Sequence, residues 1–192
     1  MKKLALLFLL VSNFLSSQTW QPLTSILSNT ISSNQRFDDV FFLNENLGWA
    51  ANGYFSEVFK TTDGGTNWIS QTTGAALGSS HYFRKIEFLD ENIGFLGTLN
   101  NKFYKTIDGG TTWSLVTNIT PNPVAICGLD CVGTSTVYGC GAYFSPAYII
   151  KSTDSGNTWQ YINMSTYADA LVEVLFLDEN IGFAAGKNPT GG

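Results

Sequence analysis

The pattern of residues most suggestive of chemistry is the stretch KTIDGGTTW, from Lys105 to Trp113, which combines one carboxylate with two glycines and three threonine hydroxyls. Such a cluster suits a phosphate-binding loop, a cation site or a tight turn. A Walker-type phosphate loop requires GxxxxGK[ST] followed by a helix, and a calcium loop requires several oxygen ligands in close succession. Here a single carboxylate precedes a strand-like segment. We therefore interpret the stretch as a turn and expect it to hold no metal ion or cofactor.

The same motif occurs three times, as KTTDGGTNW, KTIDGGTTW and KSTDSGNTW, with its aspartates Asp63, Asp108 and Asp154 spaced by 45 and 46 residues. A second motif precedes each copy, as FLNENLGWAANG, FLDENIGFLGT and the diverged GLDCVGTSTVYGCG, and it occurs once more as FLDENIGFAAG. Each unit has the pattern of four short strands joined by polar turns, and Asp-Gly favours tight hairpins. A period of about 45 residues with four strands is typical of a propeller blade.

The sequence therefore predicts an all-β repeat protein, a β-propeller of four-stranded blades. The N-terminal segment QTWQPL matches the last strand of a unit, which predicts an orphan strand that closes a ring. We favour an incomplete ring, an N-terminal fragment of a longer propeller, over a compact four-bladed ring with an incomplete last blade. The predicted elements are the orphan strand at 18–23, blades at 37–71, 84–116 and 124–162, and a partial blade at 171–186.

The unit T/S-x-D-x-G-x-T/N-W resembles the Asp-box, or bacterial neuraminidase repeat. The fuller pattern FLDENIGF…G…KTIDGGTTW resembles propellers of the photosystem II stability/assembly factor type, over nearly all of residues 18–192. In such a turn the carboxylate can accept hydrogen bonds from its own backbone, glycine permits positive φ, and tryptophan can pack between blades. The third copy departs by having Ser155 in place of the first glycine. The structural Asp-box residues are then Asp63, Gly65, Trp68, Asp108, Gly110, Trp113, Asp154, Gly156 and Trp159.

Enzymes with such repeats set requirements that the sequence can be tested against. Resemblance to sialidases would imply an arginine triad, and the chain has two arginines, Arg36 and Arg84, so we do not expect sialidase activity. Xyloglucan-cleaving glycosidases use two carboxylates, whereas most acidic residues here recur at equivalent turns. We predict no catalytic residues and no enzymatic activity. The acidic residues outside that regularity, which stay open as a catalytic pair, are Asp38, Asp39, Glu57, Glu87, Asp169 and Glu173.

Strand alternation separates the loops onto two faces of the propeller. The DEN turns and the Asp turns lie on one face, and the connections between strands 2 and 3 and between blades lie on the other, which we call the loop face. The loop face is irregular, and function concentrates on such loops. Candidates for contact with a protein partner, or with a glycan, are Tyr54, Phe55, His81, Tyr82, Phe83, Tyr143, Phe144 and Tyr167.

All three cysteines fall in the third unit. Cys131 and Cys140 flank a predicted turn near 135–136, so a disulfide between them across a hairpin is possible. Cys127 shares the alternation of Cys131 and is an alternative partner. An exported protein would permit such a bond.

The N-terminus supports export. Two lysines, an apolar run at 4–15 and the residues SSQTW are typical of a secretory signal peptide, predicted over 1–17. The run is shorter than the about 20 residues that span a bilayer, so we expect a periplasmic, cell-surface or secreted protein rather than an integral membrane protein. Without 1–17 the chain has 15 acidic and 8 basic residues, a formal charge of about -7 in place of -5, which disfavours nucleic acid as a partner.

These observations favour an exported, non-catalytic propeller that mediates protein binding or assembly, as a free protein or as a module of a larger cell-surface protein. The alternative is a polysaccharide-active glycoside hydrolase whose active site is completed by residues beyond 192.

Overall fold

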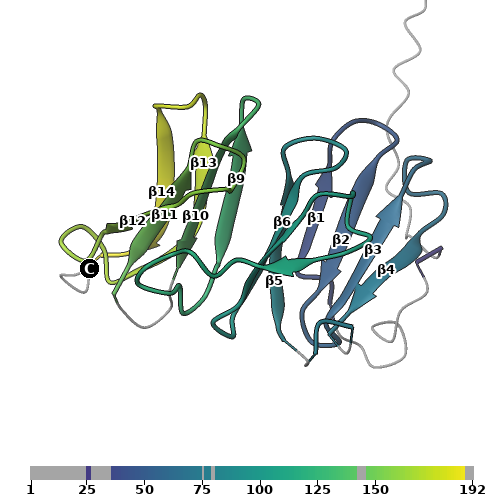
Figure 1. Ribbon diagram of the computed structural model, residues 1–192, viewed down its shortest axis with the longest axis horizontal. Helices are drawn as coiled ribbons and strands as arrows, with labels where there is room; N and C mark the ends of the chain where they lie inside the picture. Colours follow the sequence, from purple (N-terminus) through teal and green to yellow (C-terminus); the bar gives the residue numbers. More distant parts are fainter. Residues whose placement is uncertain (1–24, 27–35, 75, 79–80, 142–145, 189–192) are drawn as a thin grey trace, which may run out of the picture.

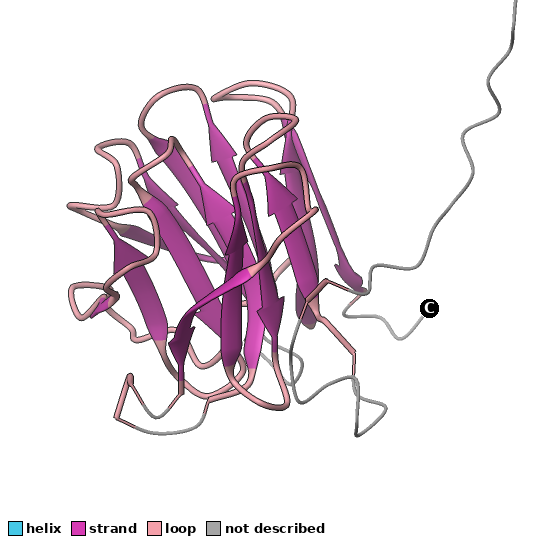
Figure 2. Ribbon diagram, turned by 90° about the vertical axis from the view of Figure 1, so that its right-hand side faces the viewer, coloured by secondary structure: helices cyan, strands magenta, loops and turns pink. Residues whose placement is uncertain are grey.

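The computed structural model describes residues 25–26, 36–74, 76–78, 81–141 and 146–188, and these form only strands, turns and loops (Figures 1 and 2). The predicted signal peptide at 1–17 and orphan strand at 18–23 lie outside the described residues. Within the described part of the chain, no helix has the length and apolar character needed to cross a membrane.

The strands form three four-stranded antiparallel sheets and one two-stranded sheet, each with its strands in chain order. We call these sheets blades 1 to 4. Blade 1 contains β1 (Asp39–Phe42), β2 (Gly48–Asn52), β3 (Glu57–Thr61) and β4 (Ile69–Thr73). Blade 2 contains β5 (Phe83–Phe88), β6 (Gly94–Thr98), β7 (Phe103–Thr106) and β8 (Ser114–Leu115). Blade 3 contains β9 (Gly128–Val132), β10 (Thr136–Gly141), β11 (Tyr148–Ser152) and β12 (Gln160–Asn163), and blade 4 contains β13 (Ala170–Phe176) and β14 (Gly182–Lys187).

The blades follow one another along an arc, with the first strand of each blade on the inside. Strand β1 contacts β5, β5 contacts β9, and β9 contacts β13. Blades 1 and 4 lie at opposite ends of the arc, so the described residues do not close a ring (Figure 1). The all-β propeller predicted from the repeat is confirmed, with an open ring.

The apolar core lies between blades, because each inner blade has a neighbour on both faces. Strands β6 and β10 are therefore buried along their whole length. Strand β2 of blade 1 is buried as well, and on its outer face Ala50 packs with Ile26 and Phe59. Between blades 1 and 2, Trp49 stacks on Phe88 with ring centroids 3.6 Å apart, and between blades 3 and 4, Tyr138 stacks on Phe176 at 3.5 Å. Such stacking of large aromatic rings holds the blades in register.

Candidate functional site

The carboxylates of the three Asp turns are bound within their own turns. Asp63 accepts a hydrogen bond from the backbone N–H of Asn67 at 2.8 Å and from the Thr61 hydroxyl at 2.9 Å, and the equivalent donors reach Asp108 and Asp154. Because these bonds favour the ionised form, the Asn67 amide lowers the pKa of Asp63, and the bonds from Thr158 and Ser152 lower the pKa of Asp154 to about 2. The turns therefore leave little carboxylate capacity for a ligand.

Backbone conformation and tryptophan packing complete these turns. Gly65 and Gly110 have φ of 87° and 91°, and their carbonyls accept hydrogen bonds from the indoles of Trp68 and Trp113. Ser155 adopts a φ of 57° in the third turn, which a non-glycine residue does at some cost. Two of the tryptophans pack in the cores between blades, Trp113 beside Phe88 and Trp159 against Phe95 and Phe103 of blade 2.

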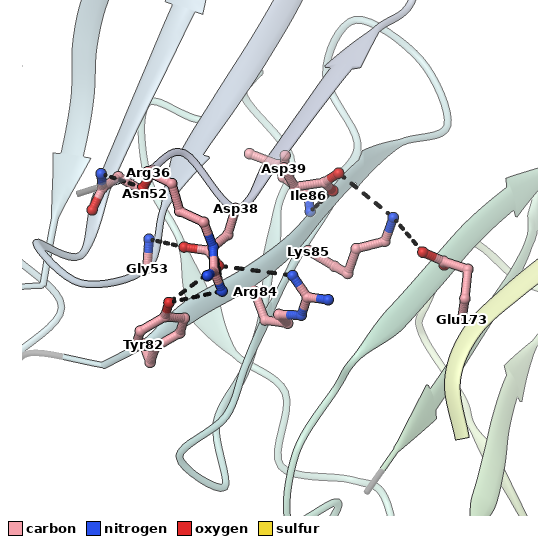
Figure 3. A network of polar contacts seen from close by, with 10 residues as sticks. All are labelled: Arg36, Asp38, Asp39, Asn52, Gly53, Tyr82, Arg84, Lys85, Ile86 and Glu173. Carbon is pink, nitrogen blue, oxygen red and sulfur yellow. Dashed lines mark hydrogen bonds and ion pairs between the residues drawn. The ribbon is translucent and has the colours of Figure 1, made fainter. Parts of the chain in front are cut away.

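Both arginines of the chain lie at the loop-face end of the innermost strands, around the buried carboxylate of Asp38 (Figure 3). Asp38 accepts hydrogen bonds from the Arg36 guanidinium at 3.1 Å, the Tyr82 hydroxyl at 3.1 Å and the Gly53 N–H at 3.0 Å. Arg84 lies 3.7 Å away, as an ion pair. The carboxylate of Asp38 thus contacts both guanidinium groups. We call Arg36, Asp38, Tyr82 and Arg84 the arginine site.

The repeat explains why this site forms. Asp38 and Arg84 are 46 residues apart, one blade period, so they occupy equivalent positions at the start of adjacent inner strands. The Arg36 side chain is 73% exposed and that of Arg84 is 25% exposed. The buried Nε of Arg84 has no hydrogen-bond partner among the described residues. The site therefore offers guanidinium groups to an anionic group at the surface.

One step further along the same strands, Lys85 joins blade 2 to blades 1 and 4. Its ammonium lies 3.5 Å from Asp39 and 3.1 Å from Glu173 (Figure 3). Burial works to lower the pKa of Lys85, but the charges of Asp39 and Glu173 outweigh it and the pKa is raised. Asp39 also accepts the Ile86 N–H at 2.9 Å. Lys85 therefore bridges the carboxylates of Asp39 and Glu173.

Glu87, on β5, has the most perturbed carboxyl of this region. Burial, together with the negative charges of Asp39 and Asp130, raises its pKa to about 8, against the opposing charge of Lys85. Glu87 is therefore protonated at neutral pH. A protonated carboxyl near ionised ones is the arrangement from which acid–base pairs are built.

Four of the six irregular acidic residues thus gather at the inner strands: Asp38, Asp39, Glu87 and Glu173. Glu57 lies on β3, and Asp169 pairs with Lys187 at 3.5 Å. Across the described ranges, no group of three or more histidine, cysteine or acidic side chains is placed to hold a metal ion.

The aromatic residues predicted for the loop face divide into several groups. Tyr54 is 60% exposed and packs edge-on against Phe55, and Tyr167 is 73% exposed. His81 is half-buried, and burial together with the charge of Lys102 lowers its pKa, so it is neutral at neutral pH. Tyr82 belongs to the arginine site.

The prediction for Phe83 is wrong. Phe83 begins β5, and its side chain is fully buried in the core between blades 1 and 2. Tyr143 and Phe144 lie outside the described residues.

The predicted disulfide is also absent, since all three cysteines are free thiols. The register sets Cys131 opposite Val137 and Cys140 opposite Gly128. Cys127 and Cys131 face the core shared with blade 2, and Cys140 faces the core shared with blade 4. Cys131 and Cys140 therefore lie on opposite faces of the sheet and are not cross-strand partners, while Cys127, whose N–H donates to the Cys140 carbonyl, is also a free thiol.

Sequence reasoning treated the two arginines only as too few for a sialidase, and it missed Lys85 and Asp130 altogether. The available signal was the position of Asp39, Lys85 and Glu173 at equivalent places in otherwise apolar inner strands. Charged residues are rarely buried unless they are paired, so such positions indicate that partners lie on neighbouring blades.

No protein-family model and no curated protein sequence matches this chain. Among solved structures, it is similar to YCF48 bound to D1 peptide, with a TM-score of 0.54 and 22% identity, over 66% of this chain and 40% of that one. It is similar to YCF48 from Cyanidioschyzon merolae, with a TM-score of 0.61 and 16% identity, over 79% and 50%. It is also similar to the GH74 enzyme of Niastella koreensis, with a TM-score of 0.54 and 24% identity, over 81% and 27%.

The chain thus spans half or less of the length of these structures. The similarity to YCF48 agrees with the assembly-factor resemblance drawn from the sequence, while the Asp-box assignment stays a prediction. At these identities the likeness extends to the fold alone. The chain has the β-propeller fold that YCF48 and GH74 enzymes share.

Proposed function

We propose that the chain is a non-catalytic propeller that binds a segment of a protein partner on its loop face. The observation that carries the proposal is the arginine site, where Arg36, 73% exposed, and Arg84 both contact the buried carboxylate of Asp38. A guanidinium group binds a carboxylate through two parallel hydrogen bonds. The partner segment is therefore an acidic peptide, or a chain end that presents its carboxylate.

Neighbouring side chains on the loop face supply apolar contact. Exposed Tyr54 and half-buried Phe55 form an aromatic pair close to the end of β2, the strand beside β1. Aromatic residues and arginine are the residue types that dominate the energy of protein interfaces. Among the similar structures, YCF48 is bound to a peptide, which supports a peptide ligand as a use of this fold. The sequence pattern at 1–17 supports an exported setting for this binding.

The proposal is tested by fluorescence polarisation with labelled peptides that differ in one respect. An acidic peptide with a free C-terminal carboxylate is compared with its amidated, glutamine-substituted analogue. We expect the acidic peptide to bind more tightly, with an affinity that falls as salt rises.

The test variant is Arg36→Gln, which removes an exposed charge and leaves Arg84 beside Asp38. We expect it to weaken binding of the acidic peptide by about ten-fold, the value of one charge-assisted hydrogen bond or slightly more. The matched control is Lys102→Gln, which removes one charge from the β6–β7 loop on the same face. Equal affinity for both peptides, or equal effects of the two variants, would contradict the proposal.

A second candidate function is glycoside hydrolysis, favoured by the raised pKa of Glu87 beside Asp130 and by the fold shared with a GH74 enzyme. Its active site would be completed by residues beyond 192. Release of reducing sugar from xyloglucan or β-glucan, abolished in Glu87→Gln, would favour this candidate over peptide binding.

A further inference from the structure

The carboxylate of Asp38 lies inside the arginine site rather than at its surface. The side chain of Asp38 is fully buried, whereas those of Arg36 and Arg84 are partly exposed. An anion that reaches these two guanidinium groups from solvent therefore meets a negative charge that both groups already contact (Figure 3).

Hydrogen bonds hold this carboxylate in place. The Gly53 N–H donates to Oδ2 of Asp38 at 3.0 Å, and the Tyr82 hydroxyl donates to Oδ1 at 3.1 Å. Hydrogen bonds to an ionised acceptor are among the strong ones in proteins. We therefore expect the Asp38 carboxylate to keep its position when an anion binds.

The end of β2 encloses the carboxylate closely. A Cβ atom at position 53 would lie 2.6 Å from Oδ2 of Asp38 and 2.6 Å from the carbonyl oxygen of Phe83, so only glycine fits there. Asn52, which is fully buried, donates from Nδ2 to the Arg36 carbonyl at 3.0 Å. The pair Asn52–Gly53 thus fixes both the Asp38 carboxylate and the backbone of Arg36.

An anion bound by the two arginines would lie close to Asp38. Oδ1 of Asp38 is 3.1 Å from Arg36 and 3.7 Å from Arg84, and a ligand oxygen lies about 3 Å from a guanidinium nitrogen. The two negative groups would then be about 5–7 Å apart, a distance at which their repulsion is reduced by solvent but still felt.

This repulsion grows with the charge of the ligand. A carboxylate carries one negative charge, whereas a phosphate monoester carries about 1.5–2 at pH 7. A guanidinium group by itself binds carboxylate and phosphate alike. The buried Asp38 carboxylate therefore opposes the phosphate more strongly than it opposes the carboxylate.

We propose that Asp38 is the specificity-determining residue of the arginine site, and that it favours a carboxylate of the partner over a phosphate group. Because Asp38 acts on the ligand of that site, this assignment rests on the proposed function. It narrows the partner to a segment that presents a carboxylate to Arg36 and Arg84, and not a phosphorylated side chain.

The experiment compares two labelled peptides that differ at one position, with glutamate in one and phosphoserine in the other. Fluorescence polarisation at low salt gives the two dissociation constants, at a pH of about 7.5, above the second phosphate pKa of about 6. The quantity of interest is the selectivity, the dissociation constant of the phosphoserine peptide divided by that of the glutamate peptide. In the wild type we expect the glutamate peptide to bind at least as tightly, although the phosphoserine peptide carries more charge.

The test variant is Asp38→Asn, which removes the charge and keeps the side-chain size. We expect its selectivity to fall about ten-fold, the effect of roughly one unit charge at this distance across a partly exposed site. A variant whose site is only distorted loses affinity for both peptides, and its selectivity does not change. The matched control is Asp39→Asn, which removes the same charge where the carboxylate contacts Lys85 at 3.5 Å, and which should change the selectivity by at most about two-fold.

Two outcomes overturn the assignment while the proposed function stands. One is binding of the glutamate peptide with equal selectivity in the wild type and in Asp38→Asn, whose folding is checked by thermal melting. The other is tighter binding of the phosphoserine peptide to the wild type, a measurement that does not depend on any variant. Absence of binding of both peptides to the wild type would refute the proposed function, and the role of Asp38 with it.

Discussion

The charge state of Glu87 allows a quantitative prediction about folding stability. Its pKa is raised from 4.5 to about 8 in the folded chain, so the unfolded chain releases the proton first as pH rises. The fold therefore loses stability between pH 4.5 and 8. Because a difference of one pKa unit corresponds to about 1.36 kcal/mol, the free energy of unfolding falls by about 5 kcal/mol at most, and by about 3 kcal/mol at pH 7.

The variant Glu87→Gln keeps the side-chain shape and removes this titration. We expect its free energy of unfolding, relative to wild type, to rise by about 3–5 kcal/mol between pH 4.5 and 8.5. Any pH-independent cost of the amide cancels in that comparison. The assay is urea denaturation at several pH values, followed by tryptophan fluorescence.

Glu91→Gln is the matched control, because Glu91 is exposed in the β5–β6 turn of the same blade. The difference in free energy of unfolding between Glu91→Gln and wild type should stay constant over the same pH range. A flat profile for Glu87→Gln as well would refute the reasoning, since it would mean that Glu87 is solvated and ionised in the folded protein.

Three further predictions concern the inner strands, the turns and the thiols. Lys85→Met should destabilise the fold by about 2 kcal/mol at pH 7 in urea denaturation. This loss is smaller than that for a fully buried ion pair, because Glu173 is 45% exposed. An unchanged denaturation midpoint would show that the Lys85 ion pairs are not formed in solution. Asp154→Ala should lower the thermal unfolding midpoint at pH 7. The gap between the midpoints of the variant and the wild type should narrow as pH falls from 3.8 toward 2, because the stabilisation by ionised Asp154 is lost as the pH falls through its folded-state pKa. Calorimetry across that pH range measures both midpoints. The three thiols should react with maleimide at pH 8 only after denaturation. Burial raises the pKa of Cys127 to about 11 and that of Cys140 to about 12, and it holds the pKa of Cys131 well above its ordinary value. Rapid labelling of the native protein would contradict the burial of these thiols.

Much of the fold could be predicted because its determinants are local and repeated. The hydrogen bonds of the first Asp turn join Asp63 to residues no more than four positions away, so sequence alone contains all the participants. Because the same turn and strand motifs recur about every 45 residues, the sequence also predicts the blades. The predictions for Phe83 and the cysteines failed because they depend on which face of a strand meets the next blade.

The sequence by itself determined the repeat, the turns and the all-β propeller class, since each depends on residues adjacent in the chain. Only the tertiary structure decided that Arg36 and Arg84 share Asp38, that Lys85 joins Asp39 to Glu173, and that Glu87 is buried among carboxylates. Most of these residues are one or more blade periods apart. Their contacts exist because equivalent positions of successive inner strands are brought side by side when the blades pack.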